Sequence, residues 1–92
     1  MAVVTVHVPS ALRELAGGRS SLRLEASSVS EALDGIREAE PLLSARLFAD
    51  DGSVRGFVNL YLDGVQVRTV DAGDRIIDAD AVLSIVPSVA GG

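Results

Sequence analysis

The spacing of hydrophobic positions predicts two strands at the start of the chain. In residues 3–8, valine stands at every second position of one predicted face, which indicates a half-buried strand that ends at Pro9. Gly17 and Gly18 mark a turn, and residues 21–25 alternate again between apolar and polar side chains. We therefore expect the first two strands to form a hairpin with a long loop.

After these strands, the hydrophobic residues recur with the period of a helix instead of at every second position. Ser28 and Glu31 have the spacing of a capping box, in which Ser28 is the N-cap of a helix. The apolar residues that follow recur at helical spacing and form one stripe: Val29, Ala32, Leu33 and Ile36. Pro41 indicates the end of this helix, and the leucines of residues 42–47 predict a short second helical segment.

The remaining third of the chain returns to strand patterns. Residues 57–62 form the strongest predicted strand, with Val58, Leu60 and Leu62 on the face suited to the helix and Phe57, Asn59 and Tyr61 on the other. Asp63 and Gly64 predict a two-residue turn that leads into a return strand over residues 65–67. A polar loop over residues 71–80 is anchored by Ile76 and Ile77, and a last strand over residues 81–86 is stopped by Pro87.

The order strand, strand, helix, strand, short strand, strand predicts an α+β roll of the β-grasp type, with a mixed sheet packed on one main helix. The length is that of one small domain. We expect the β-grasp domain to cover residues 1–87 and residues 88–92 to form a flexible C-terminal tail.

Composition limits the classes of function. The formal net charge is −5 and the eight cationic residues are all arginines without a cluster, which argues against a nucleic-acid partner. There is no cysteine, so disulfides, thiolate catalysis and cysteine-bound metals are excluded. No signal sequence and no apolar run of membrane-spanning length is present, so we expect a cytoplasmic protein without a membrane partner.

Side-chain catalysis and metal binding are poorly supported. His7, the single histidine, falls on the exposed face of its strand and has no thiol to pair with, whereas a general base needs an oriented partner. The aspartates of residues 50–51 and 78–80 lie where turns favour aspartate for backbone reasons, and their spacing is not that of an EF-hand. We expect no metal site.

The chain ends in Gly91 and Gly92, which could enter a narrow channel because glycine has no Cβ. With no side-chain nucleophile in view, the reactive group is expected to be the terminal carboxylate. A carboxylate is a poor electrophile, so it needs conversion to an anhydride, for example with AMP, by a separate enzyme that binds the nucleotide.

Three segments of this sequence resemble the MoaD/ThiS family of ubiquitin-like sulfur carriers: Phe57-Val58-Asn59-Leu60-Tyr61-Leu62-Asp63-Gly64, Asp78-Ala79-Asp80, and Leu83-Ser84-Ile85-Val86-Pro87-Ser88-Val89-Ala90-Gly91-Gly92. The resemblance covers nearly the whole chain. It is nearer to the actinobacterial carriers of cysteine or thiosugar synthesis than to the MoaD type, in which a second proline usually stands at the position of Ser88.

The resemblance implies a cycle. A ubiquitin-activating-type enzyme uses ATP to adenylate Gly92, sulfide or a persulfide displaces AMP to leave a thiocarboxylate, and a sulfur-accepting biosynthetic enzyme takes the sulfur. The carrier itself binds no cofactor and is a protein substrate, and Val89, Ala90 and Gly91 form the tail that leads to Gly92.

A partner surface is expected at Phe57 and Tyr61, because exposed aromatic residues are enriched at interfaces, and the resemblance adds Val86. Two alternatives use the same tail. The first is another carrier of the family, either the small subunit of a two-subunit synthase, as in molybdopterin synthesis, or a thiamine-type carrier. The second is a ubiquitin-like protein modifier. The chain has no lysine, so a modifier of this sequence could not form chains through its own lysines.

Overall fold

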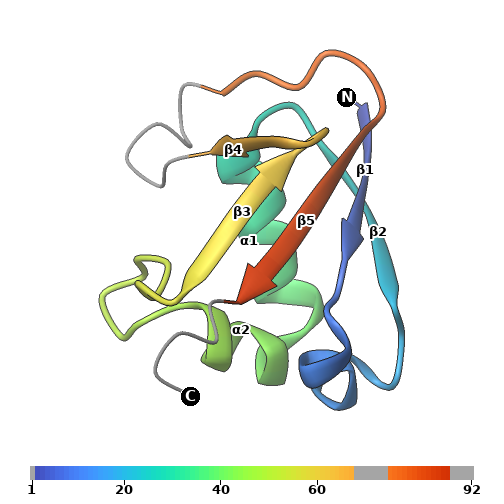
Figure 1. Ribbon diagram of the computed structural model, residues 1–92. Helices are drawn as coiled ribbons and strands as arrows, with labels where there is room; N and C mark the ends of the chain where they lie inside the picture. Colours follow the sequence, from blue (N-terminus) through green and yellow to red (C-terminus); the bar gives the residue numbers. More distant parts are fainter. Residues whose placement is uncertain (1, 68–74, 88–92) are drawn as a thin grey trace.

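A mixed five-stranded sheet forms the centre of the protein, in the order β2-β1-β5-β3-β4 (Figure 1). The computed structural model describes residues 2–67 and 75–87. The strands are β1 (Ala2–His7), β2 (Ser21–Ala26), β3 (Val58–Leu62), β4 (Val65–Val67) and β5 (Ala81–Pro87). β1 and β5 are parallel, and the other neighbouring strands are antiparallel. The predicted β-grasp arrangement, with its opening hairpin, is confirmed.

The helices lie on one face of this sheet (Figure 1). They are η1 (Ser10–Ala16, a 3-10 helix), α1 (Val29–Ala39) and α2 (Pro41–Leu47). The second helical segment is confirmed, and Pro41 is its first residue, where a missing N–H costs nothing. The long loop predicted after β1 contains η1, which the spacing did not reveal. Its Leu12 and Ala16 are buried.

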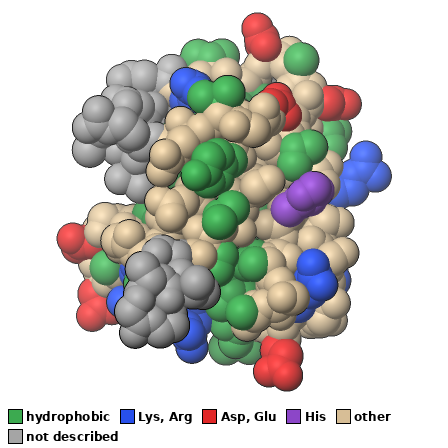
Figure 2. All heavy atoms as spheres, in the orientation of Figure 1, with side chains coloured by type: hydrophobic (Ala, Val, Ile, Leu, Met, Phe, Trp, Pro, Cys, Tyr) green, Lys and Arg blue, Asp and Glu red, His purple; other side chains and the backbone are tan. Residues whose placement is uncertain are grey.

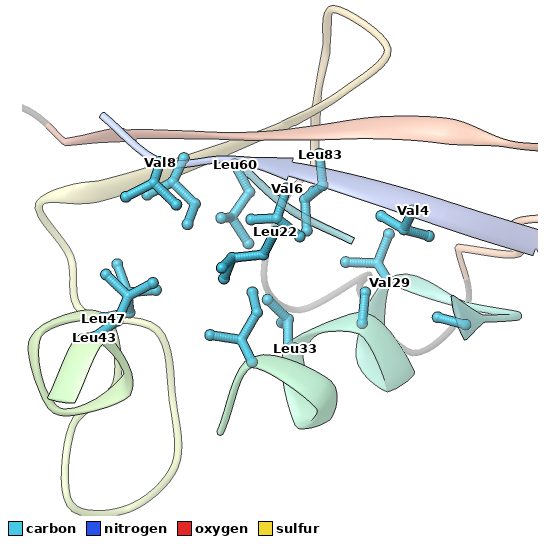
Figure 3. Packing of buried hydrophobic residues seen from close by; sticks show 14 of the residues in the cluster. Val4, Val6, Val8, Leu22, Val29, Leu33, Leu43, Leu47, Leu60 and Leu83 are labelled. Carbon is cyan, nitrogen blue, oxygen red and sulfur yellow. The ribbon is translucent and has the colours of Figure 1, made fainter. Parts of the chain in front are cut away.

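The core fills the space between the sheet and the helices. Figure 3 shows the inward side chains of β1, β2, β3 and β5 pointing at those of α1 and α2. The predicted apolar stripe of α1 is buried in full, and so are the valines at every second position of the first strand: Val4, Val6, Val8, Val29, Ala32, Leu33 and Ile36. Gly35 lets α1 approach β2 closely, since a Cβ there would lie 3.2 Å from Leu24 Cδ1.

The start of α1 has the predicted cap. Ser28 Oγ accepts a hydrogen bond of 3.1 Å from the Glu31 backbone N–H, as the capping box requires. In the standard capping box the carboxylate accepts from the N–H of the N-cap residue itself. Here Glu31 Oε1 accepts instead from the backbone N–H and the Oγ of Ser27, the residue before the N-cap, both at 2.9 Å. These bonds, the backbone one first, lower the pKa of Glu31.

Replacing this cap gives a first testable result. Ser28→Ala removes the acceptor for the Glu31 N–H, so the free energy of unfolding is expected to fall by about 1 kcal/mol. Denaturant unfolding followed by circular dichroism measures the change. Ser30→Ala, in the first turn of the same helix, is the matched control and is expected to change stability by less than about 0.5 kcal/mol. Equal losses in both variants would contradict the cap.

Two predicted details of the chain after β4 are corrected. Ile77 is buried, but Ile76 is 68% exposed, so only Ile77 anchors the loop. Neighbouring side chains of an extended segment point to opposite sides, and the Ile77 N–H donates a hydrogen bond of 2.9 Å to Ser27 O. β5 is one residue longer than expected, because Pro87 belongs to the strand as its last residue and pairs with Val58. Residues 71–74 of the predicted loop lie outside the described residues.

The predicted two-residue turn between β3 and β4 is confirmed. Asp63 and Gly64 have φ angles of 49° and 86°, which a type I′ turn requires. Asp63 also holds β5, since its backbone N–H donates to Val82 O at 2.8 Å and its Oδ1 accepts from the Val82 N–H at 2.9 Å. The turn therefore fixes the position of β5 against β3.

Candidate functional site

β5, the last strand of the described chain, ends at one edge of the sheet. Because β1 and β5 are parallel, both end at the edge where β3 begins, and Pro87 pairs there with Val58. We call this edge, marked by His7, Val58 and Pro87, the tail-exit edge. The predicted tail residues lie outside the described residues: Val89, Ala90, Gly91 and Gly92.

The sheet face turned away from α1, here named the outer face, is left uncovered by the helices of the described chain (Figure 1). Strand register aligns one row of side chains across all five strands on this face: Ser21, His7, Ser84, Tyr61 and Gln66. One step closer to the tail-exit edge, Val86 pairs with Asn59. Gln66 Nε2 donates to Asn59 Oδ1 at 3.2 Å and links the two rows.

The predicted assignment of the two faces of β3 is confirmed. Val58 and Leu60 are 6% and 2% exposed. The outward residues are less uniform than expected, because Tyr61 is half-buried rather than fully exposed. β3 lies between β5 and β4, so Tyr61 has a direct neighbour on each side, Ser84 and Gln66.

Of the three predicted partner-binding residues, Val86 and Tyr61 are neighbours on the outer face, and Phe57 lies beside the start of β3. Val86 is 43% exposed and is the diagonal neighbour of Tyr61, since their direct partners are Asn59 and Ser84. Phe57 is 46% exposed and lies just before β3, at the tail-exit edge. Sequence reasoning omitted Ser84, which lies between His7 and Tyr61; the period-two alternation of residues 82, 84 and 86 was the signal that could have identified it.

The outer face is uncharged near its centre. Figure 2 looks onto this face and shows hydrophobic and uncharged side chains in the middle, the histidine beside them, and acidic and arginine side chains around the periphery. Among the described residues, His7 makes no hydrogen bond to another side chain. The outer face thus has an uncharged, partly apolar centre surrounded by charged side chains.

Two of the aspartates considered as metal ligands, Asp51 and Asp80, accept hydrogen bonds from nearby residues. Asp80 Oδ1 accepts from the Val3 N–H at 3.0 Å, and Asp51 Oδ1 accepts from the Oγ and N–H of Ser53 at 2.6 and 3.0 Å. The bonds from Ser53, the side-chain one first, lower the pKa of Asp51. Residues 2–67 and 75–87 contain no group of three or more His, Cys, Asp or Glu side chains arranged to hold a metal ion.

The described surface includes the following two pockets. One, of about 440 Å³, lies beside α2, where the Arg37 guanidinium is held over the Phe48 ring at 4.0 Å and donates to Gly52 O at 2.6 Å. The other, of about 320 Å³, lies at the tail-exit edge and is lined by His7, Val8, Arg13, Ser20 and Ser21. None of the helices in the described part of the chain is long and apolar enough to cross a membrane.

The sequence and the fold both have known relatives. Residues 6–92 match the ThiS family. The sulfur carrier protein CysO of Mycobacterium tuberculosis is 32% identical over 92 residues, covering 97% of this chain and 98% of that protein. The small archaeal modifier protein 1 of Haloferax volcanii is 32% identical over 84 residues, covering 88% of this chain and 91% of that protein.

Solved structures agree with this relationship. The crystal structure of the Haloferax volcanii modifier superimposes with a TM-score of 0.84 at 28% identity and covers 99% of this chain and all of that one. CysO in the crystal structure of the Amycolatopsis orientalis BexX/CysO complex gives a TM-score of 0.82 at 30% identity, covering 97% of this chain and 99% of that one. The chain therefore belongs to the ThiS/MoaD family of ubiquitin-like sulfur carriers, which are substrates of partner enzymes and not catalysts.

Proposed function

We propose that this carrier transports sulfur as a thiocarboxylate on Gly92. In the first step a carboxylate oxygen of Gly92 attacks the α-phosphorus of ATP on an activating enzyme, pyrophosphate leaves, and an acyl-adenylate forms. In the second step hydrosulfide attacks the acyl carbon, the new C–S bond replaces the C–O bond to AMP, and AMP leaves. A sulfur-accepting biosynthetic enzyme then takes the sulfur. ATP is consumed by the partner, and the cycle runs in the cytoplasm.

The observation that carries this proposal is the parallel pairing of β5 with β1, which brings the end of β5 to the tail-exit edge beside the outer face. We take residues 1–87 as the domain and residues 88–92 as its tail. Five extended residues span at most about 17 Å, so an enzyme that holds the outer face has its reaction centre within that distance of Pro87. In this proposal the domain binds the partner enzyme, and the tail carries the reacting carboxylate.

The outer face is proposed to bind both partners in turn. Phe57 and Val86 are exposed large apolar side chains, and Tyr61 adds an aromatic ring between polar neighbours. A small apolar centre with a polar rim is the usual composition of a transient protein interface. The same face can serve the adenylating enzyme and the sulfur acceptor because the two bind at different stages of the cycle.

We propose cysteine or thiosugar synthesis as the destination of the sulfur. The identity of 32% with CysO over nearly the full length supports a carrier of that type. Ser88 stands where a molybdopterin-type carrier usually has a second proline, which counts against that alternative.

Intact mass spectrometry tests the chemistry. After incubation with a candidate activating enzyme, ATP and sulfide, the carrier is expected to gain the mass difference of one oxygen-to-sulfur exchange, located on Gly92 by fragmentation. Omitting ATP is the matched control, because no adenylate can form without it. An ATP-dependent change of mass at any other residue would contradict the proposal.

A second function has one observation in its favour, the likeness to the small archaeal modifier protein 1. In a modifier, Gly92 would form an isopeptide bond with a lysine of another protein. Cell extract probed with an antibody against this chain distinguishes the two. Free thiocarboxylate supports the carrier, whereas abundant adducts that survive reducing, denaturing gels without detectable thiocarboxylate support the modifier.

A further inference from the structure

The polar side chains that line the pocket at the tail-exit edge can all donate hydrogen bonds. It has a volume of about 320 Å³ and combines a guanidinium, an imidazole and two hydroxyls, from Arg13, His7, Ser20 and Ser21. A guanidinium can only donate hydrogen bonds, and the other three groups can donate as well. Such a set matches an oxyanion.

Arg13 is fixed in place without being neutralised. Its Nε donates to Val8 O at 3.1 Å, which holds the planar guanidinium and leaves the two terminal nitrogens for another acceptor. Within the described part of the chain, no carboxylate oxygen forms an ion pair with Arg13, whereas Arg19 is paired with Glu40 and Arg37 with Asp34. The Arg13 charge is therefore available to a partner.

The pocket is continuous with the outer face. His7 is directly opposite Ser84 on β5 and Ser21 on β2, so it belongs both to the pocket and to the row that contains Tyr61. Ser84 precedes Pro87 by three residues, which is about 10 Å along a strand. A group bound in the pocket thus lies close to the start of the tail.

From this arrangement we propose that the pocket binds one Asp or Glu carboxylate on the surface of the activating enzyme. The inference rests on the proposed function, because it assumes that such an enzyme holds the carrier. The Arg13 guanidinium takes the carboxylate in a bidentate pair, and His7 and Ser20 complete its hydrogen bonds.

Charge complementarity explains why one carboxylate would be used in this way. The net charge of −5 attracts a partner with a basic surface and opposes acidic groups over most of the carrier. A single acidic side chain within that basic surface is then favoured at a cationic site such as the pocket, where the Arg13 guanidinium has no carboxylate partner among the described residues. The pair would set the orientation of the carrier on the enzyme, and hence the direction in which the tail points.

Titration calorimetry of the full-length carrier with the activating enzyme tests the proposal. Arg13→Gln is expected to raise Kd about tenfold, equivalent to about 1.4 kcal/mol. Arg13→Lys keeps the charge but not the fork, so an intermediate increase is expected. Arg46→Gln, at an exposed position on α2, is the matched control and should stay within about twofold of the wild type.

A second variant covers the case in which loss of the Val8 bond unfolds Arg13→Gln. His7→Val keeps a residue suited to a strand and leaves that bond intact, and it should raise Kd about threefold. A wild-type Kd for His7→Val, or equal weakening by Arg46→Gln, would overturn the carboxylate pocket. Thiocarboxylate formation by the wild-type carrier is read separately, so failure of the pocket is distinguishable from failure of the proposed function.

Discussion

A carrier truncated after Ala90, or extended by a tag after Gly92, is expected to fold normally and to accept no sulfur. Every residue of the described hydrophobic core lies between Ala2 and Ile85, so the change should leave the free energy of unfolding within about 0.5 kcal/mol of the wild type. Loading, in contrast, needs the Gly92 carboxylate. Thermal unfolding and intact mass after activation measure the two quantities on the same sample.

Removal of the tag from the tagged variant provides its control. A protease that cuts immediately after Gly92 restores the carboxylate, and loading should return to the wild-type rate. Sulfur uptake at that rate by the uncut tagged protein would show that Gly92 is not the reacting residue.

Neighbouring residues of β3 are expected to separate stability from binding. Leu60 is 2% exposed, and Leu60→Ala should lower the free energy of unfolding by about 2–5 kcal/mol because it leaves a cavity in the core. Tyr61 is half-buried on the outer face, and Tyr61→Ala should cost about 1 kcal/mol but raise the Kd for the activating enzyme. Denaturant unfolding and titration of the enzyme provide the two measurements.

The comparison is internally controlled, since the two positions share a strand and differ in the face they occupy. Phe57→Ala should behave as Tyr61→Ala does, with a smaller loss of stability because Phe57 lies outside the strand. A large loss of stability at Tyr61 with none at Leu60 would mean that the inward and outward faces of β3 have been exchanged.

Local chemistry explains why much of the fold was predictable. Each confirmed element depends on residues close in sequence: alternation in β1, the Ser28 cap of α1, the proline at the start of α2, and the positive φ angles at Asp63 and Gly64. The helix η1 was not predicted, because it is short and has only two buried residues, Leu12 and Ala16. Two apolar residues four positions apart also occur in loops.

The parts of the candidate site that were not predictable depend on pairing between distant segments. Phe57, Tyr61 and Val86 could be placed on an outward face from alternation and family resemblance, but Ser84 gains its position beside His7 only from the parallel register of β1 and β5. The pocket was missed for a different reason. His7, Arg13 and Ser20 belong to the opening hairpin, which was predicted, but Arg13 is placed beside the other two by η1, and the spacing did not reveal η1.

The central position of β5 also affects when the protein can be used during its synthesis. β5 is the last described strand to be made, yet it fills the middle of the sheet, so β1 and β3 have no common neighbour until it arrives. Joining Asp80 to Val3 closes a loop of 77 residues, at an entropic cost of about 4 kcal/mol. The sheet is therefore completed only after β5 has left the ribosome. Because Ser84 and Val86 of β5 belong to the outer face, an enzyme that recognises this face would load finished molecules and ignore nascent ones.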